Sequence, residues 1–276
     1  MRYIEDGPRR SGGGRSDAGG WMSRNFVIAV AIFLGACAAL ASGSQWPRLL
    51  IGVLTFVAVG AGWIVGLCLH EFGHAYLAWR GGDYTVPGKG YLTLDPVKYA
   101  HPVLSIVIPL AFFALGGIGF PGAAVSVRLD LLKSRRWRSF TALAGPAGTL
   151  IFLLVLSAPF WLGLDRRFPE AIWLWCALAV LAFMQATALI LNLMPLPGLD
   201  GYAAIRPHVR GAFGQWLGRI DAAPAAGFLP IVLLLMVPGV SSLLISAGAL
   251  LTGLMGFDLM HVMVGLDAFQ FWKAGR

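Results

Sequence analysis

Long apolar runs separated by short polar segments make up most of this chain. Five of these runs carry no charged residue, and they lie at 25–42, 49–69, 141–164, 171–194 and 228–257. Each of the first four is close to the ~20 residues with which an α-helix crosses the hydrocarbon core of a bilayer. The fifth is broken at Pro238-Gly239 and is either one kinked span or a hairpin. We therefore predict an all-α polytopic membrane protein with about five transmembrane helices, the second continuing to about residue 79.

Two further segments carry patterns of their own. Segment 102–125 is apolar but rich in proline and glycine, including Pro109 and Gly116-Gly117, and such residues interrupt helices. We interpret it as a re-entrant segment. In the polar, turn-rich stretch before it, Tyr91–Leu94 alternates polar and apolar positions, which predicts a short extended piece.

The ends of the chain are polar. Residues 1–24 are basic and glycine-rich, so we expect a disordered tail. A signal peptide is the alternative, but the tail is long for one and no A-x-A cleavage site follows the first apolar run. Residues 258–276 form a short C-terminal tail, which leaves 25–257 as a single membrane-embedded domain.

Composition supports the membrane class. Of the 276 residues, 58% are hydrophobic and 12% are charged, whereas a soluble domain carries roughly 25% charged residues. The net charge of +8 follows the positive-inside rule for loops facing the cytosol. No basic face on a soluble domain suggests a nucleic-acid partner. Cys37, Cys68 and Cys176 lie in apolar runs without a C-x-x-C pair, so we predict neither a disulfide framework nor a cysteine metal site.

The main chemical motif is His70-Glu71-Phe72-Gly73-His74, an H-E-x-x-H in the second apolar helix. Residues four apart share a helix face, so both imidazoles can bind one Zn²⁺ ion while Glu71 takes a proton from its water. Zinc lowers the pKa of that water from 15.7 to about 7. Ionisable side chains inside a membrane helix are costly and therefore indicate function.

A catalytic zinc usually has three protein ligands and a water. Asp200 is the best third candidate, because it follows Pro195, Pro197 and Gly198 at the end of a membrane segment. Irregular backbone at membrane depth is tolerated where it is buried in protein or lines a cavity. The alternative interpretation of Asp200 is a helix N-cap or a turn residue.

Together these segments are similar to the site-2 protease family of intramembrane zinc metalloproteases. The resemblance is carried by the H-E-x-x-H, by Ala144-Gly145-Pro146, and by Asn192-x-x-Pro-x-Pro-x-Leu-Asp-Gly; it covers about residues 50–255. The stretch 92–96 resembles the compact prokaryotic branch without PDZ or CBS domains. This implies zinc held by His70, His74 and Asp200, with Glu71 as general base and Asn192 near the substrate.

The chain departs from that branch at Thr149, where Asn is frequent, and at Tyr99 and His101. We interpret His101 as a loop histidine, with a second polar group near the site as the alternative.

The metal hypothesis makes a demand on topology, because the histidines and Asp200 must lie at one depth. If 102–125 crossed the membrane, Asp200 would emerge on the far side; if it dips in and returns, Asp200 meets the histidines. The re-entrant topology also puts most lysines and arginines in the cytosol, with Arg48, Arg166 and Arg167 outside. We therefore expect a multi-pass protein of a prokaryotic inner membrane with its active site toward the cytosol.

The predicted function is an intramembrane zinc metalloendopeptidase that cleaves membrane-anchored proteins in the lipid bilayer. The alternatives are a non-proteolytic membrane metal-binding protein, such as a transporter or scaffold, and a degenerate protease acting as a chaperone. A binding role does not need Glu71, and the intact ligand set argues against a degenerate protease. A peptide bond in a helix is shielded by the helix's own hydrogen bonds, so a helical substrate must unwind locally before it is cleaved. We therefore hypothesise that Tyr91–Leu94 pairs with the unwound substrate as an added strand.

Overall fold

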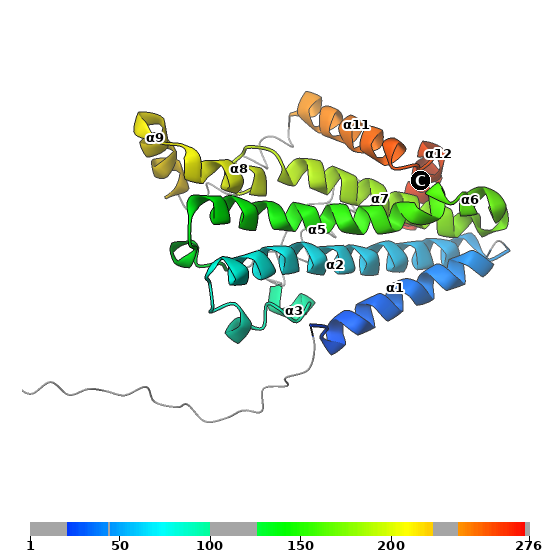
Figure 1. Ribbon diagram of the computed structural model, residues 1–276. Helices are drawn as coiled ribbons and strands as arrows, with labels where there is room; N and C mark the ends of the chain where they lie inside the picture. The colour runs from blue at the N-terminus through cyan, green and yellow to red at the C-terminus, as the bar shows by residue number, and fades with distance from the viewer. Residues whose placement is uncertain (1–20, 44, 100–125, 223–236, 274–276) are drawn as a thin grey trace, which may run out of the picture.

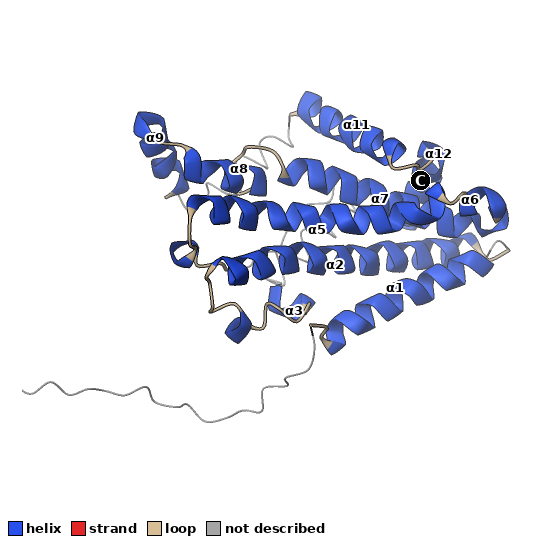
Figure 2. Ribbon diagram, viewed as in Figure 1, coloured by secondary structure: helices blue, strands red, loops and turns tan. Residues whose placement is uncertain are grey.

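The computed structural model describes residues 21–43, 45–99, 126–222 and 237–273, and every regular element in these ranges is a helix (Figure 2). The predicted re-entrant segment 102–125, His101 and most of the predicted tail 1–24 lie outside the described residues. The all-helical fold expected from the sequence is confirmed.

Four helices are long and apolar enough to cross a membrane. They are α1 (Arg24–Ser42), α2 (Arg48–Gly81), α5 (Arg135–Trp161) and α7 (Ile172–Asn192). Each matches a charge-free run, because a span must bury its backbone polar groups in its own hydrogen bonds and expose apolar side chains to lipid. Side chains such as Ile32 on α1 and Val155 on α5 are exposed in keeping with this.

The shorter helices occupy the two ends of the bundle and one of its sides. They are α3 (Pro96–Tyr99), α6 (Leu164–Arg167), α8 (Asp200–Ile205), α9 (Gly211–Asp221), α11 (Pro238–Leu254) and α12 (Leu259–Phe269), with single 3₁₀ turns η1 (Pro87–Lys89), η3 (Leu129–Leu131), η4 (Pro169–Ala171), η5 (Arg206–His208) and η6 (Phe271–Lys273).

The fifth apolar run contributes only part of itself to the described structure. Helix α11 begins at Pro238, where the run was expected to break, and it is shorter than the four spans. The residues after 257, expected to be a tail, form α12, whose Val262, Gly265 and Phe269 are buried. Asp258 caps this helix by accepting a hydrogen bond from the Met260 N–H at 2.8 Å.

The extended piece expected at Tyr91–Leu94 is wrong. The segment consists of turns, closed by hydrogen bonds from the Thr93 N–H and hydroxyl to the carbonyl of Gly90. Leu94 has a φ of 50°, in the left-handed region. These local contacts outweigh a weak four-residue alternation, and they remove the support for the added-strand hypothesis.

Helix α7 lies in the interior of the bundle, with 83% of its most apolar window buried. It packs against α2, α5, α11 and α12 (Figure 1), and also contacts α1. Helices α2 and α5 pack closely, since a Cβ on Gly73 would lie 2.2 Å from the Ala144 carbonyl oxygen and one on Gly148 would lie 2.4 Å from that of Leu69. This close approach places the H-E-x-x-H motif directly against α5.

The loop after α2 is joined to the loop before α5 through Asp83, whose carboxylate is fully buried. It accepts hydrogen bonds from the Thr85 N–H and hydroxyl and from the Arg128 N–H. Burial raises the pKa of Asp83, but these hydrogen bonds outweigh it and hold the pKa below its usual value. Asp83 thereby fixes the end of α2 relative to the start of α5.

Candidate metal centre

Helix α2 carries three ionisable side chains, those of His70, Glu71 and His74, within little more than one helical turn. His70 and Glu71 are buried, at 8% and 2% exposure, and His74 lies one turn after His70 on the same face. An ideal helix of this length is about 51 Å long, so a 30 Å hydrocarbon core centred on it would cover about residues 55–74. On that placement the motif lies within the apolar depth of the bundle, near one of its ends.

Asp200, the first residue of α8, meets these histidines. Its two carboxylate oxygens lie 3.2 Å from the Nε2 of His70 and 3.3 Å from the Nε2 of His74, and the two Nε2 atoms are 3.1 Å apart. Ligands about 2.05 Å from a tetrahedral zinc are about 3.3 Å from one another. The three groups therefore already have the spacing of a zinc ligand set, and the demand that they share one depth is met.

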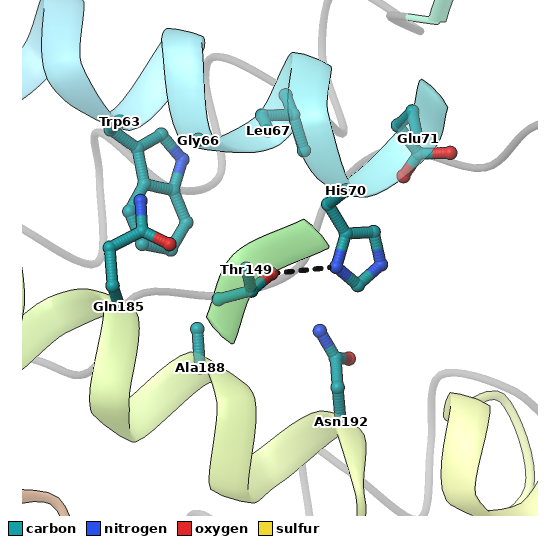
Figure 3. Close-up of a pocket in the computed structure, with 9 residues that line it drawn as sticks. All are labelled: Trp63, Gly66, Leu67, His70, Glu71, Thr149, Gln185, Ala188 and Asn192. Atoms are coloured by element: carbon teal, nitrogen blue, oxygen red, sulfur yellow. Dashed lines mark hydrogen bonds between the residues drawn. The ribbon is translucent and has the colours of Figure 1, made fainter. Parts of the chain in front are cut away.

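The outer nitrogens of both imidazoles are engaged by α5. His74 Nδ1 lies 2.7 Å from the backbone carbonyl oxygen of Thr141. A carbonyl only accepts, so this nitrogen carries the proton and Nε2 presents a lone pair to the centre. His70 Nδ1 lies 2.9 Å from the Thr149 hydroxyl (Figure 3), which can accept in the same way. Such outer contacts fix the tautomer and ring orientation of metal-binding histidines.

Gly145 explains part of the Ala-Gly-Pro motif. A Cβ at this position would lie 2.1 Å from His74 Nε2 and 2.6 Å from His70 Nε2. The absence of a side chain thus leaves a hollow facing both nitrogens, on the side where an ion would sit. Two lone pairs and a carboxylate converging on that hollow repel one another unless a cation lies between them, so the residues present fit zinc.

The loop before α8 is shaped to present Asp200. Gly198 has a φ of 90°, which favours glycine. A Cβ on Gly201 would lie 2.2 Å from the Leu193 carbonyl oxygen, so the loop closes tightly on the start of α8. The Ser139 hydroxyl of α5 contacts the Ala204 carbonyl at 2.6 Å and so attaches α8 to α5. The irregular backbone expected from the two prolines is therefore rigidly supported.

Asp200 completes the set with an anionic oxygen ligand, since an aspartate carboxyl is ordinarily ionised at neutral pH.

Asn192 is the last residue of α7 and is 6% exposed. It lines a cavity that His70, Glu71 and Thr149 also line. The five candidate site residues predicted from the sequence thus lie around the metal centre and this adjoining cavity: His70, Glu71, His74, Asn192 and Asp200. The structure adds Thr149, which the sequence marked only as a departure from the family, and Gly145. The sequence feature that could have pointed to Thr149 and Gly145 is their helical spacing, since Thr141, Gly145 and Thr149 follow one another at intervals of four on α5.

Comparison with known proteins gives close relatives. The chain is 45% identical over 247 residues to a protein of Mycolicibacterium smegmatis named as zinc metalloprotease Rip2, covering 82% of this chain and 90% of the relative. It is 50% identical over 202 residues to the Mycobacterium tuberculosis protein of that name, covering 73% and 74%. It is 34% identical over 193 residues to a Bacillus subtilis protein named as zinc metalloprotease YwhC, covering 63% and 78%.

Two other comparisons give nothing. No family model matches the chain. No solved structure matches it either.

Proposed function

This chain belongs to the site-2 protease family of zinc metalloproteases, and from that premise we propose that it hydrolyses peptide bonds of membrane-anchored proteins at membrane depth. The supporting observation is the convergence of His70, His74 and Asp200 at 3.1–3.3 Å inside a bundle of apolar helices. A substrate within the bilayer lies at the same depth as this centre.

In this proposal His70, His74 and Asp200 hold the zinc. When bound there, zinc supplies a water of lowered pKa and polarises the scissile carbonyl. The Thr141 carbonyl and the Thr149 hydroxyl keep each histidine in the tautomer that turns its Nε2 lone pair to the centre. Because both contacts come from α5, the two rings are fixed before substrate arrives.

Glu71 is the general base of this proposal. It lines the same cavity as His70 and is 2% exposed, so its carboxylate acts in a site from which bulk water is largely excluded. The carboxylate accepts a proton from the attacking water and returns it to the nitrogen of the leaving amine, so the peptide bond breaks without net change in protons. Asn192, across the cavity on α7, would hold the unwound substrate backbone with its carboxamide.

The distribution of arginines indicates which side of the membrane the metal centre faces. Arg80, Arg135, Arg136 and Arg138 lie where α2 ends and α5 begins, which is the end of the bundle nearest α8 and the metal centre (Figure 1). Arg48 lies at the opposite end, at the start of α2. By the positive-inside rule we propose a prokaryotic inner membrane protein with the metal centre toward the cytosol.

The test compares wild type with Glu71→Gln in detergent and in liposomes. Zinc content is measured together with cleavage of a single-span model substrate. We expect both proteins to hold zinc and only the wild type to cleave. Equal cleavage by both would contradict the role of Glu71 as general base, whereas bound zinc without any cleavage by the wild type would favour a non-proteolytic metal-binding role.

A further inference from the structure

A cavity of about 30 Å³ leads away from the metal centre between α2 and α7. Near the centre its wall includes His70 and Asn192, and at its other end it includes Gly66 and Gln185 (Figure 3). Gln185 precedes Asn192 by two helical turns, so the cavity extends roughly 10 Å along α7 toward the middle of the spans. The proposed hydrolysis does not use this deep end.

Gln185 is unusual in its surroundings. It is 3% exposed, and its neighbours along α7 are apolar apart from Thr187. Within the described part of the chain no hydrogen bond reaches its carboxamide, whereas the Thr187 hydroxyl is satisfied by the Phe183 carbonyl of its own helix at 2.7 Å. The Gln185 carboxamide lines the cavity, so a polar group that enters the cavity can hydrogen-bond to it.

The opposite wall is shaped around this side chain. A Cβ on Gly66 would lie 2.2 Å from Gln185 Nε2 and 2.9 Å from a ring carbon of Phe152. Any larger residue would displace the carboxamide or the ring. Helix α2 therefore leaves room for Gln185 one turn before His70, and the carboxamide projects from α7 toward α2 (Figure 3).

We propose that this deep end is a side-chain subsite, and that Gln185 selects a small substrate side chain bearing a hydroxyl or thiol group. The inference rests on the proposed function and adds a specificity determinant to it. Along an extended chain at ~3.3 Å per residue, a subsite within about 10 Å of Asn192 serves a residue within about three positions of the cut.

Size and polarity both favour this occupant. A water needs about 10–15 Å³ of such space and two to four polar partners, so the cavity holds about two waters or one small side chain. Gly66, Ala188 and the Trp63 indole also line the deep end, and the indole N–H is a second polar group beside the Gln185 carboxamide (Figure 3). A tethered Ser or Cys side chain needs only one polar partner, which Gln185 supplies, while a Leu or Phe side chain exceeds the space.

The experiment uses the full chain and peptides of a single-span model substrate. Each position within four of the mapped cut is occupied in turn by Ser, Ala, Val or Leu. Binding is measured on Glu71→Gln protein and kcat/KM on protein with Glu71 intact, each with and without Gln185→Leu. Thr187→Val is the matched control, because it removes a buried polar group from α7 that its own helix satisfies.

We expect one position at which Ser is preferred over Val, and Gln185→Leu should reduce that preference by about fivefold to tenfold, the effect of one hydrogen bond. Gly66→Ala should further restrict that position to Ala. Thr187→Val should leave the preference unchanged, and zinc content should be equal in all variants.

Equal effects of Gln185→Leu on every peptide, or no effect, would overturn the subsite and indicate that the cavity holds only water. A Gln185-dependent preference in binding, without cleavage by the wild type, would preserve the subsite and refute the protease. Absence of both binding and cleavage would refute both.

Discussion

Replacement of Gly145 by alanine should remove zinc from a protein that still folds. The added Cβ would lie 2.1 Å from His74 Nε2 and 2.6 Å from His70 Nε2, where ordinary contact begins at 3.4 Å. His74 must therefore withdraw by about 1.3 Å, far beyond the ±0.2 Å that metal–ligand distances tolerate. The nearest clashing atoms belong to side chains, so the rings can rotate away while α2 and α5 remain packed.

The expected loss of zinc affinity exceeds the 10–100-fold that removal of an outer-shell partner costs, because the ligands themselves are displaced. Zinc content by atomic spectroscopy and competition with a chelator measure it, alongside circular dichroism and gel filtration for folding. Gly60→Ala is the control, since nothing lies within 4 Å of a Cβ at that position of α2. One full equivalent of zinc held by Gly145→Ala with wild-type affinity would refute the geometry of the centre.

Three further outcomes are expected. Gly73→Ala should lower the thermal unfolding midpoint well below that of Gly60→Ala, because its Cβ meets the backbone oxygen of Ala144 at 2.2 Å and neither can rotate away; an unchanged midpoint would contradict the close packing. Thr149→Val should weaken zinc binding by about 10–100-fold in chelator competition, while Thr149→Ser retains it; equal affinities would exclude a positioning role. Because hydrogen bonds lower the pKa of Asp83, its stabilisation is present above about pH 4 and is lost as pH falls through the lowered folded value. Asp83→Asn should therefore flatten the acid side of the stability–pH curve, and an unchanged curve would argue against it.

The spans could be predicted from sequence because a bilayer imposes a uniform rule, that about 20 consecutive residues must be apolar. Asp200 was found by a second rule, that irregular backbone at the end of a span is tolerated where it lines a cavity. Both rules act locally on the chain, so they can be applied before any tertiary structure is known.

What the sequence did not disclose depends on contacts between distant segments. Thr149 gains its place only because α5 packs against α2, and Gln185 becomes notable only when α7 is seen to be buried on nearly every side. The alternation at Tyr91–Leu94 failed for a different reason. Four residues carry too little signal to outweigh the turn that begins at Gly90.

The zinc environment of the purified wild type is the most direct test, and X-ray absorption spectroscopy measures it. We expect about one zinc per chain, with nitrogen and oxygen ligands at about 2.0–2.2 Å and the scattering of two imidazoles. A sulfur ligand at about 2.3 Å, or a protein that binds no zinc, would contradict a centre built from His70, His74 and Asp200.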